Sequence, residues 1–435
     1  MDAVERFDRY LEHLSQALKH ADRHAGLRGY CTGLMLPLAR KSVEPMAARL
    51  DPLHASARHQ ALHHFVAKAH WCDTQLLRQV AQWVVPRMDF SQGGWWIIDD
   101  TGFPKKGRHS VGVARQYCGQ LGKQDNCQVA VSVSLSNAQG SLPLAWRLYL
   151  PKDWAGDAQR RHKAGVPDSI EFATKPQIAL AQLRALLDQG APRHPVLADA
   201  GYGVDHAFRQ ALTDMGLPYM VGVTSTVTLW PAQAAPRLPK PRGWVPVMYR
   251  DTRKPMSARD LALALSPDAL RLIEWRQGTN EALRGHFAAM RVHYAGATVS
   301  RASLQPEQWL LVEWPPDEAE PSRYYLSTLP EDTPLDKLVD TAHRRWRIER
   351  DYQDLKQDCG LGHYEGRGWR GFHHHASLSI AAYGFLMAER LMAEHTSGDK
   401  KNFILQVPAV SQDYVPRGSA ARATARSNFD HEFAP

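Results

Sequence analysis

The alternation of apolar and polar residues predicts different kinds of local structure along the chain. In residues 1–88, apolar side chains recur every three or four positions, as between Phe7 and Leu18, and this spacing predicts amphipathic helices. The pattern changes at "GGWWIIDDTG", where residues 95–98 are all apolar. An uninterrupted apolar run of this kind is typical of a central strand that is covered on both faces. We therefore expect an N-terminal helical domain over residues 1–88, followed by a sheet. Histidines and arginines recur along this domain, which indicates either a DNA-binding domain or a solvated helical surface.

The sequence pattern of residues 89–224 predicts the first part of an α/β core. Apolar residues alternate over 129–135 and again over 142–150, on either side of the turn sequence "NAQG", which indicates a hairpin. A helix is expected from the N-cap Thr174 to Gly190. Short apolar strands in "HPVLADAGYG" and "LPYMVGV" follow, with a second helix between them. Strands that alternate with helices in this way predict a mixed sheet.

The remainder of the chain divides into three segments. Residues 225–333 contain strand-like pieces such as "QWLLVEW" and "RYYLSTL" separated by Gly- and Pro-bearing turns, and they predict a β-rich insertion subdomain. Helical spacing returns over residues 334–394, the expected second part of the core. Residues 395–435 are expected to form a loosely ordered C-terminal tail.

The composition is that of an ordinary globular protein, with 44% apolar and 23% charged residues. The net charge of +8 and the pI near 9.2 fit either simple solubility or a polyanionic partner such as nucleic acid. The five cysteines form no Cys-x-x-Cys pair, which argues against a disulfide scaffold or a zinc knuckle. The charged N-terminus and the short apolar runs predict a cytoplasmic protein without a signal peptide or membrane span.

Two acidic residues stand where predicted buried strands end. Asp99 follows the run at 95–98, and Asp199 follows "VLA". Burying a charged carboxylate costs several kcal/mol unless a cation or a hydrogen-bond donor compensates it. Metal ions would supply that compensation. The alternative is that each aspartate caps the turn or helix that follows it.

A third acidic residue lies on a predicted helix over 344–359. At about 100° per residue, a polar row falls in one narrow sector, and a buried stripe lies roughly 60° away. The polar row is Arg345, Glu349, Tyr352 and Lys356, and the stripe is Ile348, Tyr352, Leu355 and Cys359. The row therefore lies on the shoulder of the buried face. The alternative is an exposed Arg–Glu pair that contributes only a few tenths of a kcal/mol.

Three carboxylates that converge from two strands and a helix form the usual binding site for two divalent cations. All-oxygen ligation favours Mg²⁺, with Mn²⁺ as a substitute, over zinc. Such ions activate a water or a 3′-hydroxyl for attack on a phosphodiester. Arg345 and Lys356 would then neutralise DNA phosphates beside the metal site.

The acids in "IIDDTG", "VLADAGYG" and "RWRIERDYQDLKQDCGLGHYEGR" together resemble the DDE transposases of bacterial insertion sequences. The third segment is similar to the Tyr-x2-Arg-x3-Glu-x6-Lys signature of that superfamily. Arg345, Glu349 and Lys356 match its last three positions, whereas the tyrosine position falls on Ala342. The resemblance covers about residues 90–390.

The resemblance implies an RNase H-like core with a β-rich insertion before the helix that carries the third acid. It implies metal-dependent cleavage and strand transfer at insertion-sequence ends, with Asp99, Asp199 and Glu349 as catalytic metal ligands and two Mg²⁺ ions per site. The implied partners are double-stranded DNA, as terminal inverted repeats and target, and a second copy of the chain in the DNA complex. The implied location is the nucleoid.

Several alternatives remain open at this stage. Asp100 is an alternative metal ligand to Asp99. The cations Lys105, Lys106 and Arg108 are either a solvated run or a phosphate clamp near the site. The three adjacent histidines of "GFHHHAS" are not expected to bind one metal ion, because adjacent helical side chains point in different directions. The competing functions are a catalytically inactive DNA-binding protein and an RNase H-like nuclease without strand transfer.

Overall fold

The computed structural model describes residues 2–234, 254–277, 282–296 and 305–396 of the 435-residue chain. The tail from residue 397 onward, for which loose order was predicted, lies outside the described residues. All five cysteines are free thiols. Within the described ranges, no helix combines the length and the apolar character that crossing a membrane requires.

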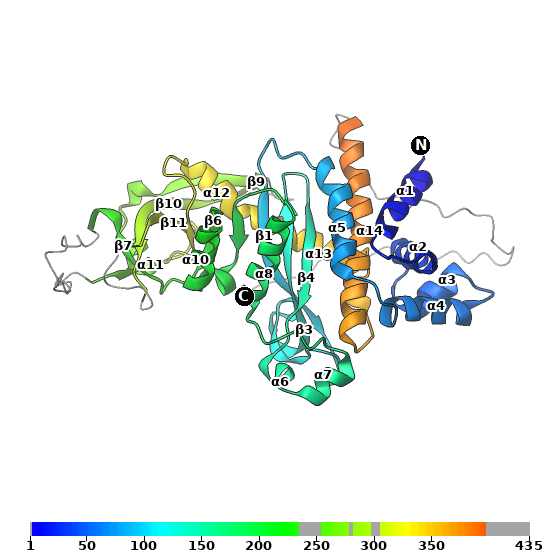
Figure 1. Ribbon diagram of the computed structural model, residues 1–435. Coiled ribbons are helices and arrows are strands. Elements are labelled where there is room, and N and C mark those ends of the chain that lie inside the picture. Colours follow the sequence, from blue (N-terminus) through cyan, green and yellow to red (C-terminus); the bar gives the residue numbers. More distant parts are fainter. Residues whose placement is uncertain (1, 235–253, 278–281, 297–304, 397–435) are drawn as a thin grey trace.

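The N-terminal region is helical, as predicted. It consists of α1 (Ala3–Ser15), α2 (His24–Met35), α3 (Val43–Leu50), α4 (Ala55–Ala67) and α5 (Asp73–Val84). Helices α1–α4 lie on one side of the long C-terminal helix α14 (Trp369–Thr396), and α5 stands beside α14 on the side of the sheet (Figure 1). The hydroxyl of Tyr10 donates to the carbonyl of Ala381 at 2.8 Å. The N-terminal helices therefore share a core with the last helix.

Five strands form the central part of the sheet. They are β1 (Trp95–Pro104), β3 (Lys123–Ser136), β4 (Ser141–Leu148), β5 (Val196–Ala198) and β6 (Tyr219–Val223). Their order is β4-β3-β1-β5-β6. Strand β3 is antiparallel to both β4 and β1, whereas β1, β5 and β6 are parallel to one another. The short strand β2 (Ala114–Cys118) pairs with the first half of β3. This arrangement is the RNase H-like core that the sequence predicted.

The helices of the core include the two that the sequence predicted, one from Thr174 to Gly190 and one between the strands of "HPVLADAGYG" and "LPYMVGV". They are α6 (Lys152–Ala155), α7 (Ala158–Ala164), α8 (Lys175–Asp188), α9 (Ala200–Gly203) and α10 (His206–Asp214). Helix α8 begins at a capping box in which the Thr174 side chain accepts from the backbone N–H of Gln177. Two residues after α8 ends, Gly190 adopts a positive φ of 86°, a conformation that glycine adopts without strain. The predicted start and end of this helix are therefore confirmed.

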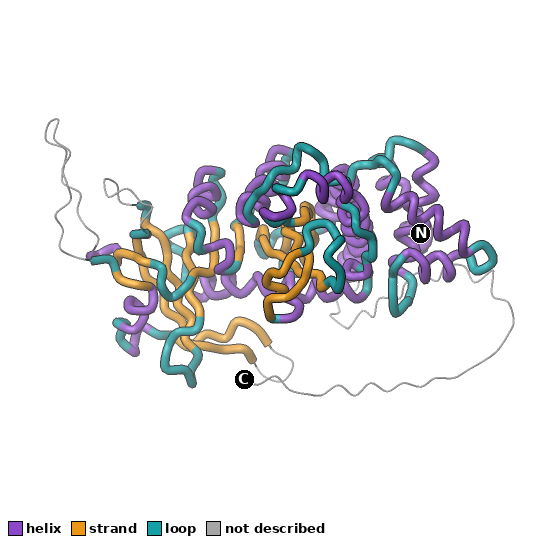
Figure 2. The backbone as a smooth tube through the Cα atoms, turned by 90° about the horizontal axis from the view of Figure 1, so that it is seen from below, coloured by secondary structure: helices purple, strands orange, loops and turns teal. Residues whose placement is uncertain are grey.

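The β-rich insertion extends the core sheet instead of forming a sheet of its own. It contains β7 (Thr228–Pro231), β8 (Met256–Ser257), α11 (Ala258–Leu263), β9 (Arg271–Gln277), β10 (Ala282–Tyr294), β11 (Glu307–Trp314) and β12 (Arg323–Ser327). Strand β12 pairs antiparallel with β6, so one twelve-stranded sheet runs from the core into the insertion. Figure 2 shows these strands at the end of the molecule away from the N-terminal helices.

The helix predicted over 344–359 is interrupted near its start. The chain forms α12 (Leu335–His343), a 3₁₀ turn over Arg344–Trp346, and α13 (Arg347–Gln357). All four residues of the predicted stripe are buried, and Asp351 is buried with them. The single continuous helix was therefore wrong at its first turn, although its buried face was predicted correctly.

Candidate active site

Adjacent parallel strands bring Asp99 and Asp199 to the same level of the sheet. The register pairs Trp96 with Val196 and Ile97 with Leu197, and the same offset carried two residues further places Asp99 beside Asp199. Neighbouring strands lie about 4.8 Å apart. The Asp199 side chain also caps α9, because its Oδ1 accepts from the N–H of Gly201 at 2.9 Å. Capping thus holds the Asp199 carboxylate at the strand end without removing it from the site.

The two neighbouring aspartates of β1 make different contacts. The Asp100 carboxylate forms an ion pair with the Lys175 ammonium group at 2.5 Å and accepts from the Tyr202 hydroxyl at 3.4 Å. The Asp99 carboxylate lies 3.6 Å from the Arg345 guanidinium. Successive side chains of a strand point to opposite faces. Asp99 therefore faces the segment that carries Glu349, whereas Asp100 faces α8 and α9.

Arg345 lies between the first and third acids. One guanidinium nitrogen is 3.6 Å from Asp99 Oδ2, and another is 3.5 Å from Glu349 Oε1. Glu349 is otherwise open to solvent, with 68% of its side chain exposed. Glu349, Arg345 and Asp199 line one cavity of about 390 Å³ between the strand ends and α12–α13.

Burial and two neighbouring carboxylates disfavour the charged form of Asp99. Burial, together with the charges of Asp199 and Asp100, raises the pKa of Asp99 to about 7, although Arg345 acts in the opposite direction. The donor oxygens are those that Mg²⁺ and Mn²⁺ prefer. A cation between Asp99 and Asp199 would relieve the repulsion between these carboxylates. The chemistry of this pair therefore fits a divalent ion.

The third acid does not complete this set in the present arrangement. Among the described residues, no three His, Cys, Asp or Glu side chains are grouped closely enough to hold an ion together. The Glu349 carboxylate instead interacts with Arg345. Glu349 would have to leave Arg345 to join the two aspartates.

The predicted phosphate-binding cations fall into different environments. The Lys356 ammonium group lies 3.4 Å from the Gly102 carbonyl and 5.4 Å from the centre of the Phe103 ring, and burial lowers the pKa of Lys356. It therefore lies along β1, the strand of Asp99. Lys105 donates to the Tyr364 carbonyl at 2.8 Å, so its position indicates a structural role.

Lys106 and Arg108 take part in no ion pair among the residues that the structure describes. They line a cavity of about 480 Å³ together with Arg115 and Arg160. Arg115 and Arg160 were not predicted from the sequence, because they lie on β2 and α7, away from the run after β1. Their clustering depends on the packing of α7 beside the β2–β3 hairpin.

Two other charged residues near the acids were also missed. Lys175 is the first residue of α8, and its pairing with Asp100 follows from the packing of α8 beside β1. Arg323 begins β12 and lines the same cavity as Glu349. The segment "RYYLST" predicted a strand, but only the pairing of β12 with β6 places Arg323 at this cavity.

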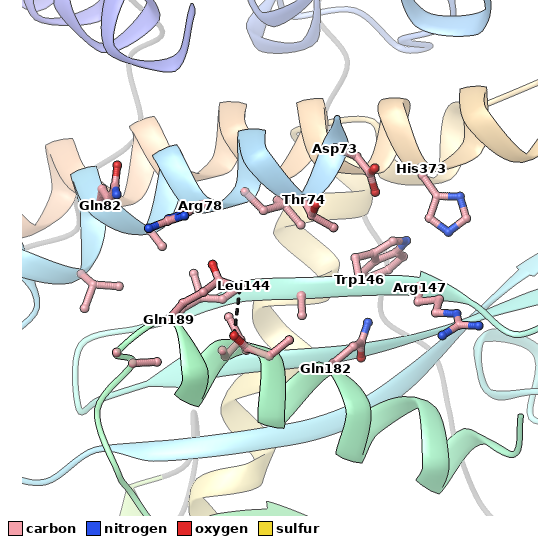
Figure 3. Close-up of a pocket in the computed structure, with 18 of the residues that line it drawn as sticks. Asp73, Thr74, Arg78, Gln82, Leu144, Trp146, Arg147, Gln182, Gln189 and His373 are labelled. Carbon is pink, nitrogen blue, oxygen red and sulfur yellow. Dashed lines mark hydrogen bonds between the residues drawn. The ribbon is translucent and has the colours of Figure 1, made fainter. Parts of the chain in front are cut away.

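A separate pocket of about 510 Å³ lies between α5 and α8 (Figure 3). Its lining is mainly apolar and contains a single carboxylate, that of Asp73. Asp73 and His373 lie together at one end of it (Figure 3). A single carboxylate does not make a metal–carboxylate site, so this pocket is distinct from the acids of the sheet.

The three adjacent histidines of α14 bind three different sets of partners. A ring nitrogen of His373 accepts from the N–H of Leu148 at 3.2 Å. The ring of His374 lies between the carbonyls of Val66 and Trp71, and that of His375 contacts the hydroxyl of Tyr30 at 2.9 Å. These residues connect α14 to its neighbours.

The sheet order and the paired strand-end aspartates define an RNase H-like protein with a carboxylate site. The family model described as "DDE superfamily endonuclease" matches residues 13–282. The chain therefore belongs to this family, as its motifs predicted. The matched range includes Asp99 and Asp199 and ends before Glu349. Enzymes of this superfamily generally use divalent metal ions.

A curated relative from Microchaete diplosiphon is described as a probable transposase for insertion sequence element IS701. It is 33% identical to this chain over 194 residues, which are 44% of this chain and 47% of the relative. The similarity thus spans about half the length of either protein.

Proposed function

We propose that this protein is a DNA transposase that cleaves insertion-sequence ends and transfers the cut strands to target DNA. The observation that carries this proposal is the placement of Asp99 beside Asp199, with Arg345 bridging Asp99 to Glu349. Membership of the DDE superfamily endonucleases and the similarity to the IS701 transposase support the same function.

In this proposal Asp99, Asp199 and Glu349 would hold two Mg²⁺ ions, and Mn²⁺ would substitute. When bound, the ions supply the positive charge that activates a water or 3′-hydroxyl and stabilises the leaving oxygen of the phosphodiester. Asp99 is preferred to Asp100 because Asp100 already has Lys175 as its counter-ion.

Arg345 has two successive roles in this proposal. In the absence of DNA its guanidinium partly neutralises Asp99 and Glu349. A DNA phosphate offers the same group a bidentate anionic partner. Movement of Arg345 to that phosphate would release both carboxylates for the metal ions, so that the complete site forms only on DNA. Lys356, Lys106 and Arg108 would bind neighbouring phosphates.

The test is cleavage of DNA that carries the inverted repeats flanking the gene. With Mg²⁺, the wild-type protein is expected to nick these ends, whereas Asp199→Asn and Glu349→Gln are expected to be inactive at an unchanged melting temperature. Asp354→Asn, on the same helix as Glu349, is the matched control and should retain activity. A folded wild-type protein that binds the ends but never cuts them with either ion would identify an inactive DNA-binding protein.

Strand transfer needs its own measurement. Pre-cut ends incubated with a supercoiled target plasmid are expected to yield joined products. Hydrolysis of the ends without any joined product would identify a nuclease instead. The proposed homodimer in the DNA complex is tested by the mass of the purified complex in light scattering.

A further inference from the structure

A second cleft lies where the N-terminal helices meet the core. Its volume is about 610 Å³, and it is bounded by α4, the C-terminal end of α7 and the segment 363–371 before and at the start of α14. We call it the junction cleft. Its walls come from three parts of the chain that are roughly a hundred to three hundred residues apart in sequence. It shares no lining residue with the cavity of Asp199 and Glu349.

The junction cleft collects positive charge from each of its walls. Lys68 follows α4, Lys163 lies in the last turn of α7, and Arg367 precedes α14; all three side chains are exposed. Within the described residues none of the three takes part in an ion pair. The cleft has two acidic residues, and one of them, Glu365, is already paired with Arg40. Unpaired cations are therefore in excess.

The wall that carries Arg367 is held in place by close packing. A Cβ atom on Gly366 would come within 2.0 Å of the Tyr364 hydroxyl, and one on Gly371 within 1.8 Å. The Tyr364 ring in turn stacks on His375 at 5.3 Å. Glycine at both positions thus lets the segment fold tightly over Tyr364, so the adjacent Arg367 is attached to a packed backbone.

The same wall is hydrogen-bonded to the segment that follows β1. The Lys105 ammonium group donates to the Tyr364 carbonyl at 2.8 Å, and the N–H of Val111 donates to the Arg367 carbonyl at 3.0 Å. The junction cleft is therefore connected by short contacts to the end of the strand that carries Asp99. An anion bound in the cleft would be positioned relative to the carboxylate site.

We infer that the junction cleft binds the sugar–phosphate backbone of double-stranded DNA, at a contact separate from the cleavage site. Three unpaired cations on three walls match a row of phosphates better than a single small anion, because a duplex presents phosphates at regular spacing. Contacts of this kind fix the position of a duplex without reading its sequence. The choice of DNA as the polyanion rests on the proposed transposase function.

The experiment measures binding without cleavage. Full-length protein is titrated into a fluorescently labelled duplex in EDTA, and anisotropy is followed from 50 to 200 mM salt. The test variant is Lys163→Glu with Arg367→Glu. The control is Arg9→Glu with Arg184→Glu, which makes the same change in net charge at two exposed arginines on α1 and α8 that line none of the cavities described above.

The test variant is expected to bind at least about tenfold more weakly, and the slope of log affinity against log salt should become shallower by about 2, one for each lost phosphate contact. The control should stay within about twofold of wild type. Lys163→Arg with Arg367→Lys keeps both charges and should bind like wild type. Far-UV circular dichroism of each variant verifies that it is folded.

Three results would overturn the inference. Equal weakening by the test and control pairs would mean that only net charge matters. Unchanged affinity in the test variant would mean that DNA does not enter the cleft. Tighter binding of an RNA duplex than of the DNA duplex would identify a different polyanion.

The cleavage assay separates this inference from the proposed function. If Asp199→Asn still cuts DNA but the cleft variant binds weakly, the carboxylate proposal fails and the cleft stands. If Asp199→Asn is inactive but binds DNA normally, and the cleft variant also binds normally, the cleft inference alone fails.

Discussion

Replacement of Asp351 by alanine should strongly destabilise the protein, because this buried carboxylate connects three elements. Its Oδ2 accepts from the backbone N–H of Ser141 at 3.1 Å and from the Ser141 hydroxyl. Its Oδ1 accepts from the Tyr383 hydroxyl at 2.9 Å, and the Arg347 guanidinium lies 3.7 Å away. Asp351 thereby attaches α13, the helix of Glu349, to β4 and α14.

The expected loss follows from these contacts. Asp351→Ala leaves the Ser141 N–H, the Tyr383 hydroxyl and the Arg347 charge without their acceptor in a buried environment. Each orphaned neutral donor costs about 1–3 kcal/mol, and breaking a buried ion pair from one side costs about 3–5 kcal/mol. These terms overlap, so we expect the free energy of unfolding to fall by about 3–5 kcal/mol.

Asp354→Ala is the matched control on the same helix. Its carboxylate lies 3.8 Å from the Arg390 guanidinium with a quarter of its side chain exposed, and burial raises the pKa of Asp354. The Asp354 charge therefore contributes little to stability, and its removal should change the free energy of unfolding by less than about 1 kcal/mol.

The assay is urea unfolding followed by tryptophan fluorescence at pH 7 in EDTA, without DNA. Tyr383→Phe combined with Asp351→Ala should cost less than the sum of the two single changes, because both remove the same hydrogen bond. If Asp351→Ala were no more destabilising than Asp354→Ala, the assignment of Asp351 as the connection between α13, β4 and α14 would be refuted.

Three further predictions concern charge. Asp99→Asn should stabilise the metal-free protein at pH 8 by up to about 4 kcal/mol. The folded-state pKa of Asp99 is about 7, so the wild-type protein loses stability as the pH rises from about 4 to 7. Urea unfolding in EDTA that shows no gain in the free energy of unfolding would contradict this prediction. The Arg345→Ala variant should bind Mn²⁺ more tightly than the wild-type protein in the absence of DNA, since Asp99 and Glu349 lose their counter-ion. An unchanged affinity for Mn²⁺ in titration calorimetry would exclude competition between Arg345 and the metal ion. Burial lowers the pKa of His374 and of His375 to about 4. The free energy of unfolding should therefore fall between pH 6.5 and pH 4 by up to about 3 kcal/mol for each histidine. An unfolding midpoint that stays constant over this range would show that these rings are not buried in the neutral form.

Local sequence signals predicted the elements that carry the site. The apolar run before Asp99 became the central strand β1, and the cap at Thr174 became the start of α8. These features depend on residues within a few positions of one another, so a sequence pattern is sufficient to predict them. The 3₁₀ turn at Arg344–Trp346 broke the predicted helix without any glycine or proline to mark the interruption.

The contacts of the site depended on packing between distant segments. Pairing of β1 with β5 placed Asp99 beside Asp199, and the position of α8 gave Asp100 the counter-ion Lys175. Lys105 and Lys106 are neighbours in sequence, yet one is held by Tyr364 and the other lines a cavity.

The sequence by itself determined the main helices and strands of the core in their order, the membership of the DDE superfamily and the three candidate acids. The tertiary structure decided which aspartate faces Glu349, that Arg345 occupies the space between the acids, and that the insertion continues the core sheet. The physical reason is range: hydrophobic period and capping act over a few residues, whereas strand register and ion pairing join groups far apart in the chain, such as Asp99 and Arg345, which are about 250 residues apart.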